Sequence, residues 1–202
     1  MKKRQRRGKR EVSVAKKNGV LKSMNAIQRK KISTAEDANF PKLWRICKTA
    51  FPLPERRVLE QQLEIFEKRS YNLDAWIQKK QVIGFMGWWD FEQFRYVEHY
   101  AINPEYRARG YGSSFLQEWL SESRKKVILE IEPVRDEKTQ RRLNFYKKLA
   151  FVENDYKHLQ PPFHKGGKAV LYEILSYPEK IQPEIYNSFV AKQKFEVMPQ
   201  IE

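Results

Sequence analysis

The sequence has little cysteine and no long apolar run, which argues against a disulfide-bonded protein and against a membrane-spanning one. Cys47 is the only cysteine among the 202 residues, so no disulfide can form within the chain. This composition favours a reducing, cytoplasmic location. No stretch reaches the roughly 18 consecutive apolar residues that would predict a membrane span, and the first residues lack the apolar region of a secretory signal. We therefore expect a cytoplasmic protein with no membrane partner.

Two phosphate-binding signatures and the usual metal-ligand spacings are also missing. The sequence contains neither the G-x-G-x-x-G fingerprint of dinucleotide-binding folds nor the G-x-x-x-x-G-K-[ST] P-loop. His158 and His164 have no cysteine or carboxylate at the spacing of a metal site. We predict no metal ion.

Positive charge is concentrated at the start of the chain. Residues 1–31 hold 13 Lys/Arg and one acidic residue, Glu11, whereas the remaining 171 residues hold 27 basic and 24 acidic residues. Of the net charge of +15, +12 therefore belongs to the first 31 residues. We expect residues 1–28 to form a disordered basic tail. It could be a solvated tail, a misassigned start with Met24 as the initiator, or a segment that binds nucleic acid or the ribosome.

Hydrophobic periodicity predicts one α/β domain over residues 29–176, with a mixed, mostly antiparallel sheet flanked by helices. The expected order is β-α-α-β-β-β-α-β-α-β-β. Helices are predicted after Ser33 or Thr34 and over residues 53–70, 111–124 and 136–151. Strands are predicted near residues 30–34 and over 71–79, 81–91, 95–103, 126–133, 151–157 and 169–175, with a loop at 158–168. Residues 177–202 are expected to form a C-terminal extension, with a helix around Phe189.

The stretch INPEYRARGYGSSFLQEWL, residues 102–120, places two arginines and two glycines between a strand and a helix. Glycine permits positive φ and close approach of a ligand to the backbone. The first N–H groups of a helix have no internal partner and suit a phosphate, and Arg107 and Arg109 add charge. The stretch is therefore either an anion-binding loop or a tight turn that is basic.

Together with RRLNFYKKLAF at residues 141–151, this stretch resembles the GNAT superfamily of acetyl-CoA-dependent N-acetyltransferases. The resemblance covers roughly residues 31–176 and implies direct transfer of an acetyl group from acetyl-CoA to a primary amine. Ala150 departs from the family pattern, which usually has glycine at this position.

The resemblance also implies which residues bind acetyl-CoA. The backbone of Tyr100, Ala101 and Ile102 is expected to pair with the pantetheine arm. The N–H groups of the loop are expected to hold the pyrophosphate, and they belong to Arg107, Ala108, Arg109, Gly110, Tyr111, Gly112 and Ser113. Tyr146 is expected beside the coenzyme sulfur, with an ordinary core position as the alternative.

Catalytic and acceptor residues are expected on the strand before this loop, on the strand after the following helix, and at Trp89 on an earlier strand. Glu98 is the predicted base, placed by alternation on the same face as Tyr96 and Tyr100, with His99 on the opposite face; a solvent-facing glutamate is the alternative. Glu130 and Glu132 are predicted to attract a cationic amine, or to be paired with Arg141 or Arg142. Trp89 is predicted at the acceptor site, with a core position as its alternative.

Other functions and partners remain open. The chain could be a module that binds an acyl-CoA without turnover, or an RNA- or ribosome-associated protein that uses its basic tail. The acceptor could be a small or a peptide amine. A homodimer could form through the last strands or the C-terminal residues.

Overall fold

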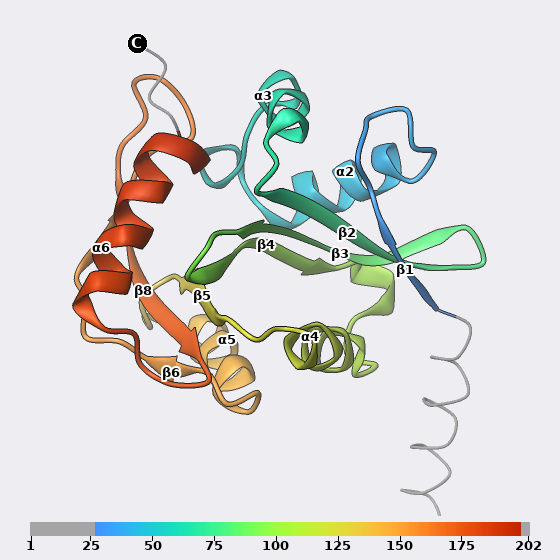
Figure 1. Cartoon of the computed structure of the whole chain (residues 1–202). Helices are drawn as coiled ribbons and strands as arrows, with labels where there is room; N and C mark the ends of the chain where they lie inside the picture. Colours follow the sequence, from blue (N-terminus) through green and yellow to red (C-terminus); the bar gives the residue numbers. More distant parts are fainter. Residues whose placement is uncertain (1–26, 199–202) are drawn as a thin grey trace, which may run out of the picture.

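The computed structural model describes residues 27–198, which fold around one eight-stranded mixed sheet (Figure 1). The strand order is β1-β2-β3-β4-β5-β8-β6, and β7 pairs with β8. Only β4 and β5 run parallel among the described pairs. The strands are β1 (Gln28–Lys31), β2 (Tyr71–Gln78), β3 (Gln81–Asp90), β4 (Phe94–Ile102), β5 (Lys126–Ile131), β6 (Val152–Glu153), β7 (His158–Gln160) and β8 (Val170–Tyr177). The expected mixed, mostly antiparallel sheet is confirmed.

Helices cover both faces of the sheet, as Figure 1 shows. The α2 (Phe40–Ala50) and α3 (Leu59–Glu64) helices lie on one face, and α4 (Tyr111–Ser121) and α5 (Glu137–Lys147) lie on the other. The α6 helix (Pro183–Lys192) packs on the α2 face and continues into the π-helical segment η4 (Gln193–Val197). Short 3-10 turns occur at η1 (Leu53–Glu55), η2 (Ile65–Glu67) and η3 (Pro104–Tyr106). No helix within residues 27–198 is long and apolar enough to cross a membrane.

Each face of the sheet has its own hydrophobic core. Leu43 and Ile46 of α2 pack with Trp89, Phe94 and residues of α6 on the first face. The second face contains residues from α4, α5 and the central strands, including Phe115, Trp119, Val127, Leu129 and Leu143. The sheet is therefore buried on both sides, and access to its backbone is restricted to places where neighbouring strands separate.

Several predicted elements differ from the structure. The α2 helix begins at Phe40 and not after Ser33 or Thr34, because an Asp37 carboxylate oxygen accepts the Asn39 N–H at 2.9 Å and stabilises a turn there. The single helix predicted over residues 53–70 is divided into η1, α3 and η2, and Pro52 and Pro54 restrict the backbone at its start. Residues 158–160, predicted as loop, form β7.

The C-terminal residues up to Met198 belong to the same folded body, and α6 lies where a helix is expected around Phe189. The Phe189 side chain is 0% exposed, and its ring contacts Tyr96 at a centroid distance of 5.1 Å and Phe94 at 6.0 Å. Val197 and Met198 are buried in the same core. The predicted basic tail lies outside the described residues except at its end, because β1 already begins at Gln28.

Strands β4 and β5 separate after four residue pairs. Phe94–Val97 pair with Lys126–Leu129, and within the described residues the rest of β4, from His99 to Ile102, pairs only with β3. A β-bulge lies at the same point: Val97 pairs with Trp88, His99 pairs with Gly87, and Glu98 is the extra residue. The second half of β4 therefore has one free edge.

Candidate active site

The loop between β4 and α4 contains a backbone conformation that favours glycine. Gly110 precedes α4 with φ +83°, in the left-handed region. A Cβ built on Gly110 would meet no atom within 4 Å, so the space beside this residue is open. Ala108 also has positive φ, at +59°. The loop thus turns sharply and exposes its backbone.

Several N–H groups of this loop are free to bind an anion. The Arg107 N–H donates to the Pro104 carbonyl at 3.3 Å, so this predicted donor is already engaged. No acceptor within residues 27–198 is found for the N–H groups of Ala108, Arg109, Gly110, Gly112 and Ser113. The last two lie in the first turn of α4, where the partial positive charge of the helix favours an anion.

The two arginines of the loop each use part of their guanidinium to shape it. Arg107 Nε donates to the Ile102 carbonyl at 3.0 Å, and Arg109 Nη2 donates to the Glu105 carbonyl at 2.9 Å. Arg109 also lies over the Tyr106 ring at 5.3 Å. A guanidinium has five N–H donors, so both arginines retain donors that can bind a phosphate.

The end of β4, the start of α4 and the last turn of α5 meet beside this loop. The Tyr100 hydroxyl donates to the Gly112 carbonyl at 2.6 Å. A Cβ on Gly112 would lie 3.5 Å from Ile102 and 3.7 Å from Phe145. The predicted cofactor-binding backbone at residues 100–102 and the predicted anion-binding loop are therefore neighbours in space.

Tyr146 is held at the end of α5 by a Schellman motif. The Phe151 N–H donates to the Tyr146 carbonyl at 3.2 Å, the Ala150 N–H donates to Lys147 at 3.1 Å, and Ala150 has φ +64°. The Tyr146 ring packs edge-on against Phe145 and Phe151. Burial raises the pKa of Tyr146 to about 12, partly offset by Arg142, so the hydroxyl keeps its proton at neutral pH and acts as a donor.

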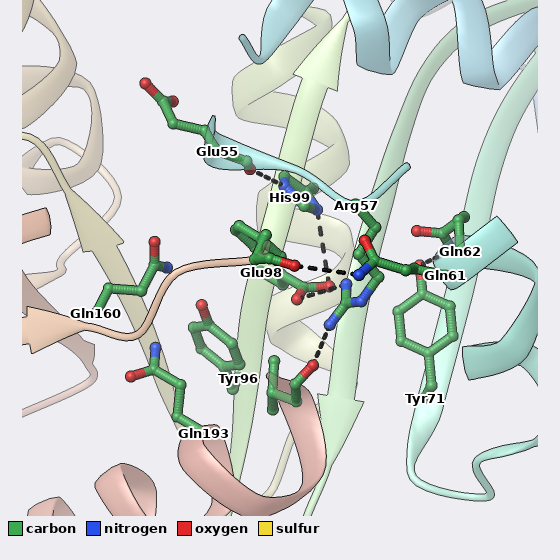
Figure 2. A network of polar contacts seen from close by, with 12 residues as sticks. Glu55, Arg57, Gln61, Gln62, Tyr71, Tyr96, Glu98, His99, Gln160 and Gln193 are labelled. Carbon is green, nitrogen blue, oxygen red and sulfur yellow. Dashed lines mark hydrogen bonds and ion pairs between the residues drawn. The ribbon is translucent and has the colours of Figure 1, made fainter. Parts of the chain in front are cut away.

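Glu98 lies at the point where β4 and β5 separate, in a buried ion pair (Figure 2). Its side chain is 1% exposed, and Oε1 lies 2.8 Å from Arg57 Nη1. Arg57 also donates to the Val197 carbonyl, and its guanidinium lies over the rings of Trp89 and Phe163. Arg57 could not be recognised from the sequence, because the Arg56–Arg57 pair resembles an ordinary exposed start of a helix.

The predicted orientation of His99 is wrong. Its ring lies on the same side of the sheet as Glu98, with Nδ1 3.7 Å from Glu98 Oε2, because the bulge adds one residue and breaks the alternation. For the same reason Tyr100 packs with the second core and does not share a face with Glu98. His99 Nε2 lies 2.8 Å from the Glu55 carbonyl. Figure 2 marks this contact with a dashed line.

Glu130 lies on β5, directly after the last residue that pairs with β4, and is fully engaged. Its carboxylate accepts hydrogen bonds from Tyr96 (2.5 Å), Gln160 (2.9 Å) and Gln193 (2.9 Å), and His158 Nε2 lies at 2.7 Å. This buried carboxylate thus joins β4, β5, β7 and η4. Its geometry fits a structural role and not direct contact with an amine.

Glu132 and Trp89 each follow the alternative to substrate binding: Glu132 is in an ion pair and Trp89 is in the core. Glu132 is partly exposed and paired with Arg142 at 2.5 Å, whereas Arg141 pairs with Glu137. Trp89 is 0% exposed and stacks on Phe91. The predicted contact between Trp89 and a substrate is therefore wrong in this geometry, because Trp89 lies in the core behind Arg57.

A further carboxylate, that of Glu55, lies near Glu132 and was not predicted from the sequence. Burial, followed by the negative charge of Glu132, raises the pKa of Glu55, and Arg142 and Lys138 oppose that shift. Glu55 belongs to the η1 turn, whose carbonyl also fixes His99. Within residues 27–198, no group of three or more His, Cys, Asp or Glu residues is arranged to hold a metal ion.

Residues 72–153 match the family model of the acetyltransferase (GNAT) domain. The chain carries a GNAT acyltransferase domain. A solved structure assigned to the GNAT acetyltransferase family, from Bacteroides thetaiotaomicron, shares 27% identity and a TM-score of 0.78 with this chain. The similarity covers 85% of this chain and 98% of that protein.

More distant structures share the GNAT fold. The ribosomal-protein-S18-alanine N-acetyltransferase of Escherichia coli is 17% identical, with a TM-score of 0.57 over 78% of this chain and 97% of its own. Ard1 of Thermoplasma volcanium is 20% identical, with a TM-score of 0.54 over 74% and 96%. No curated protein matches the chain in a sequence search.

The part of the chain that matches the GNAT family model runs from β2 to β6. Arg57, α6 and η4 lie outside it, although Arg57 and η4 contact each other beside Glu98.

Proposed function

We propose that this protein is an N-acetyltransferase that moves an acetyl group from acetyl-CoA directly to a primary amine. One observation carries the proposal: the free edge of β4 leads into a loop in which the N–H groups of Ala108, Arg109, Gly110, Gly112 and Ser113 have no acceptor within the described residues. An extended ligand can pair with a free strand edge, and a phosphate can bind the following helix start. The edge and the loop are joined in the order that a pantetheine arm and a diphosphate require.

The residues present fit acetyl-CoA, which supplies the acetyl thioester. The backbone of Tyr100, Ala101 and Ile102 pairs with the pantetheine arm, and the loop N–H groups hold the pyrophosphate. The open space at Gly110 leaves room for the phosphates. Arg107 and Arg109 add charge through their remaining donors.

Glu98 and Tyr146 provide the acid–base chemistry in this proposal. An amine with a pKa near 10.4 is charged at pH 7, and freeing its lone pair costs about 4–5 kcal/mol. Glu98 accepts that proton through a bridging water, because its own carboxylate is buried. The Tyr146 hydroxyl, protonated at neutral pH, donates a hydrogen bond to the leaving sulfur.

The deciding experiment is a panel of amines incubated with acetyl-CoA, with thiol release as the measurement. We expect release with at least one cationic amine, and a loss of about 100-fold or more in kcat for Glu98→Gln. Tyr146→Phe removes only the hydroxyl and should lower kcat with little change in KM. Binding of acetyl-CoA without release by any amine would favour the alternative of a non-catalytic acyl-CoA-binding module. Full activity in both variants would remove Glu98 and Tyr146 from the mechanism.

The anion-binding role of the loop is tested separately with two matched glycine variants. Gly110→Glu should weaken acetyl-CoA binding in calorimetry by at least about tenfold, because a carboxylate would face the phosphates. Gly166→Glu is the control, since Gly166 also has positive φ (+77°) and open space around it. Equal losses in both variants would contradict the proposed role of the Gly110 loop.

A second candidate function concerns the basic residues at the start of the chain. Residues 1–31 carry a net charge of +12, whereas the rest of the chain is nearly balanced. Clustered Lys and Arg bind phosphates by releasing counterions. We propose that this segment brings the acyltransferase to a nucleic-acid partner.

A further inference from the structure

We propose that Glu98 and His99 accept the proton of the acceptor amine as one pair, with Glu98 as the catalytic residue and His99 as its positioning residue. This inference rests on the proposed transferase function. It assigns a role to His99, which simple strand alternation would place on the other face of the sheet.

The β-bulge in β4 brings the two side chains together. In a regular strand, neighbouring side chains point to opposite faces. Here Glu98 is the extra residue of the bulge, and His99 Nδ1 lies 3.7 Å from Glu98 Oε2. The His99 ring is held edge-on against Phe51 at 4.5 Å and is stacked on Phe163 at 5.8 Å. The ring therefore cannot turn away from Glu98 without disturbing both contacts.

The partner of the other ring nitrogen fixes where the His99 proton lies. Nε2 lies 2.8 Å from the Glu55 carbonyl, which can only accept a hydrogen bond. Nε2 therefore carries the hydrogen, and Nδ1 of the neutral ring directs its lone pair toward Glu98. Burial lowers the pKa of His99, although the negative charge of Glu98 opposes this shift. His99 is thus neutral at pH 7.

Glu98 and neutral His99 cannot form a hydrogen bond with each other, because neither of the two facing atoms carries a hydrogen. Arg57 supplies one positive charge against the single negative charge of Glu98. The Glu98 Oε2 atom and the His99 Nδ1 atom are then both acceptors facing each other. One added proton would let Oε2 donate to Nδ1. The other titratable groups whose charge acts on these residues are Arg56, Cys47, Tyr71 and Tyr96, with Glu130 behind Tyr96.

The proton balance of the reaction follows from this arrangement. The ammonium N–H bond breaks, and its proton passes through water to Glu98 Oε2, which then donates a hydrogen bond to His99 Nδ1. The electron pair left on the amine nitrogen forms the bond to the acetyl carbon as the carbon–sulfur bond breaks. The sulfur takes that bond's electrons and then a second proton from the nitrogen. Glu98 finally returns its proton to water, so no other reactant is needed.

Two His99 variants separate this role from simple packing. His99→Asn keeps an oxygen acceptor near the position of Nδ1 but loses the contact with Glu55. His99→Gln keeps a donor near the position of Nε2 but loses the acceptor next to Glu98. Without an acceptor, protonated Glu98 is less stable, so the acid limb of kcat/KM should move to lower pH by about one unit in His99→Gln. His99→Asn should keep the wild-type midpoint.

Nitrogen NMR of the His99 ring tests the pair in the free protein, independently of catalysis. We expect Nε2 protonated and Nδ1 unprotonated at pH 7, and a lower His99 pKa in Glu98→Gln, because the negative charge is lost. A proton on Nδ1, or no response to Glu98→Gln, would overturn the pairing even if no amine is acetylated. An active enzyme whose acid limb does not move in His99→Gln would also overturn it, while leaving the proposed transferase function intact.

Discussion

Ala150 has a backbone conformation that residues with a side chain rarely adopt. Its φ of +64° ends α5 and completes the hydrogen bonds that hold Tyr146. Alanine pays a steric cost in this region that glycine avoids. The residue thus carries local strain beside the proposed catalytic tyrosine.

We predict that Ala150→Gly stabilises the protein by about 0.5–1 kcal/mol, because glycine relieves this strain at the helix end. Urea unfolding followed by circular dichroism measures the change. Ala150→Val is the matched control, and it should destabilise the protein because a β-branched side chain disfavours positive φ. A lower stability of Ala150→Gly than of wild type would show that no strain is stored there.

Individual site residues show where sequence reasoning succeeds and where it fails. Gly110 could be recognised, because positive φ restricts the choice of residue. The face of His99 could not, because a bulge leaves no mark in the pattern of apolar and polar residues. The role of Arg57 could not be predicted either, because its ion pair with Glu98 joins segments 41 residues apart in the sequence.

At the scale of elements, α6 and η4 contribute to the site although they follow the last residue of the GNAT family model. The Val197 carbonyl accepts a hydrogen bond from Arg57, and Gln193 donates to Glu130. Phe189 anchors α6 against β4. The C-terminal segment therefore supports both buried carboxylates where β4 and β5 separate.

We predict that Phe189→Ala lowers the free energy of unfolding by about 3–4 kcal/mol, because a fully buried ring is lost and a cavity remains. Val190→Ala, on the next residue of α6 and 37% exposed, should cost less than about 1 kcal/mol. Thermal or urea unfolding measures both. Similar small losses in the two variants would mean that α6 is only loosely attached.

Elements with strong periodicity were predicted well. The helices at 111–121 and 137–147 and the three strands of the central meander lie within a few residues of their predicted bounds. The predicted helix over 53–70 failed, because tertiary contacts turn Arg57 and Gln62 inward and interrupt the helical spacing. Strand β7 was missed, since a three-residue strand within a loop rich in Pro and Gly has too few residues to show alternation.

At the scale of the whole molecule, the charge is divided between a basic start and a nearly neutral remainder. We predict that the full chain binds a mixed-sequence RNA in low salt and that binding weakens steeply as salt rises. Deletion of residues 1–23 should abolish this binding. The measurement is fluorescence anisotropy at several salt concentrations.

The control for the deletion is acetyl-CoA binding, which should be unchanged because the proposed coenzyme contacts lie between residues 100 and 113. RNA binding that survives the deletion would place the nucleic-acid contact on the folded domain. No RNA binding by the full chain would remove the second candidate function.

The extra residue in β4 has a consequence for the interpretation of related proteins. Aligning this strand with one that lacks the insertion shifts every later position by one, and inward and outward residues then exchange places. An alignment without a gap would then compare Glu98 with the residue that, in the other strand, occupies the place of His99. Strand β4 should therefore be superposed by its backbone trace before any proton acceptor is assigned by analogy.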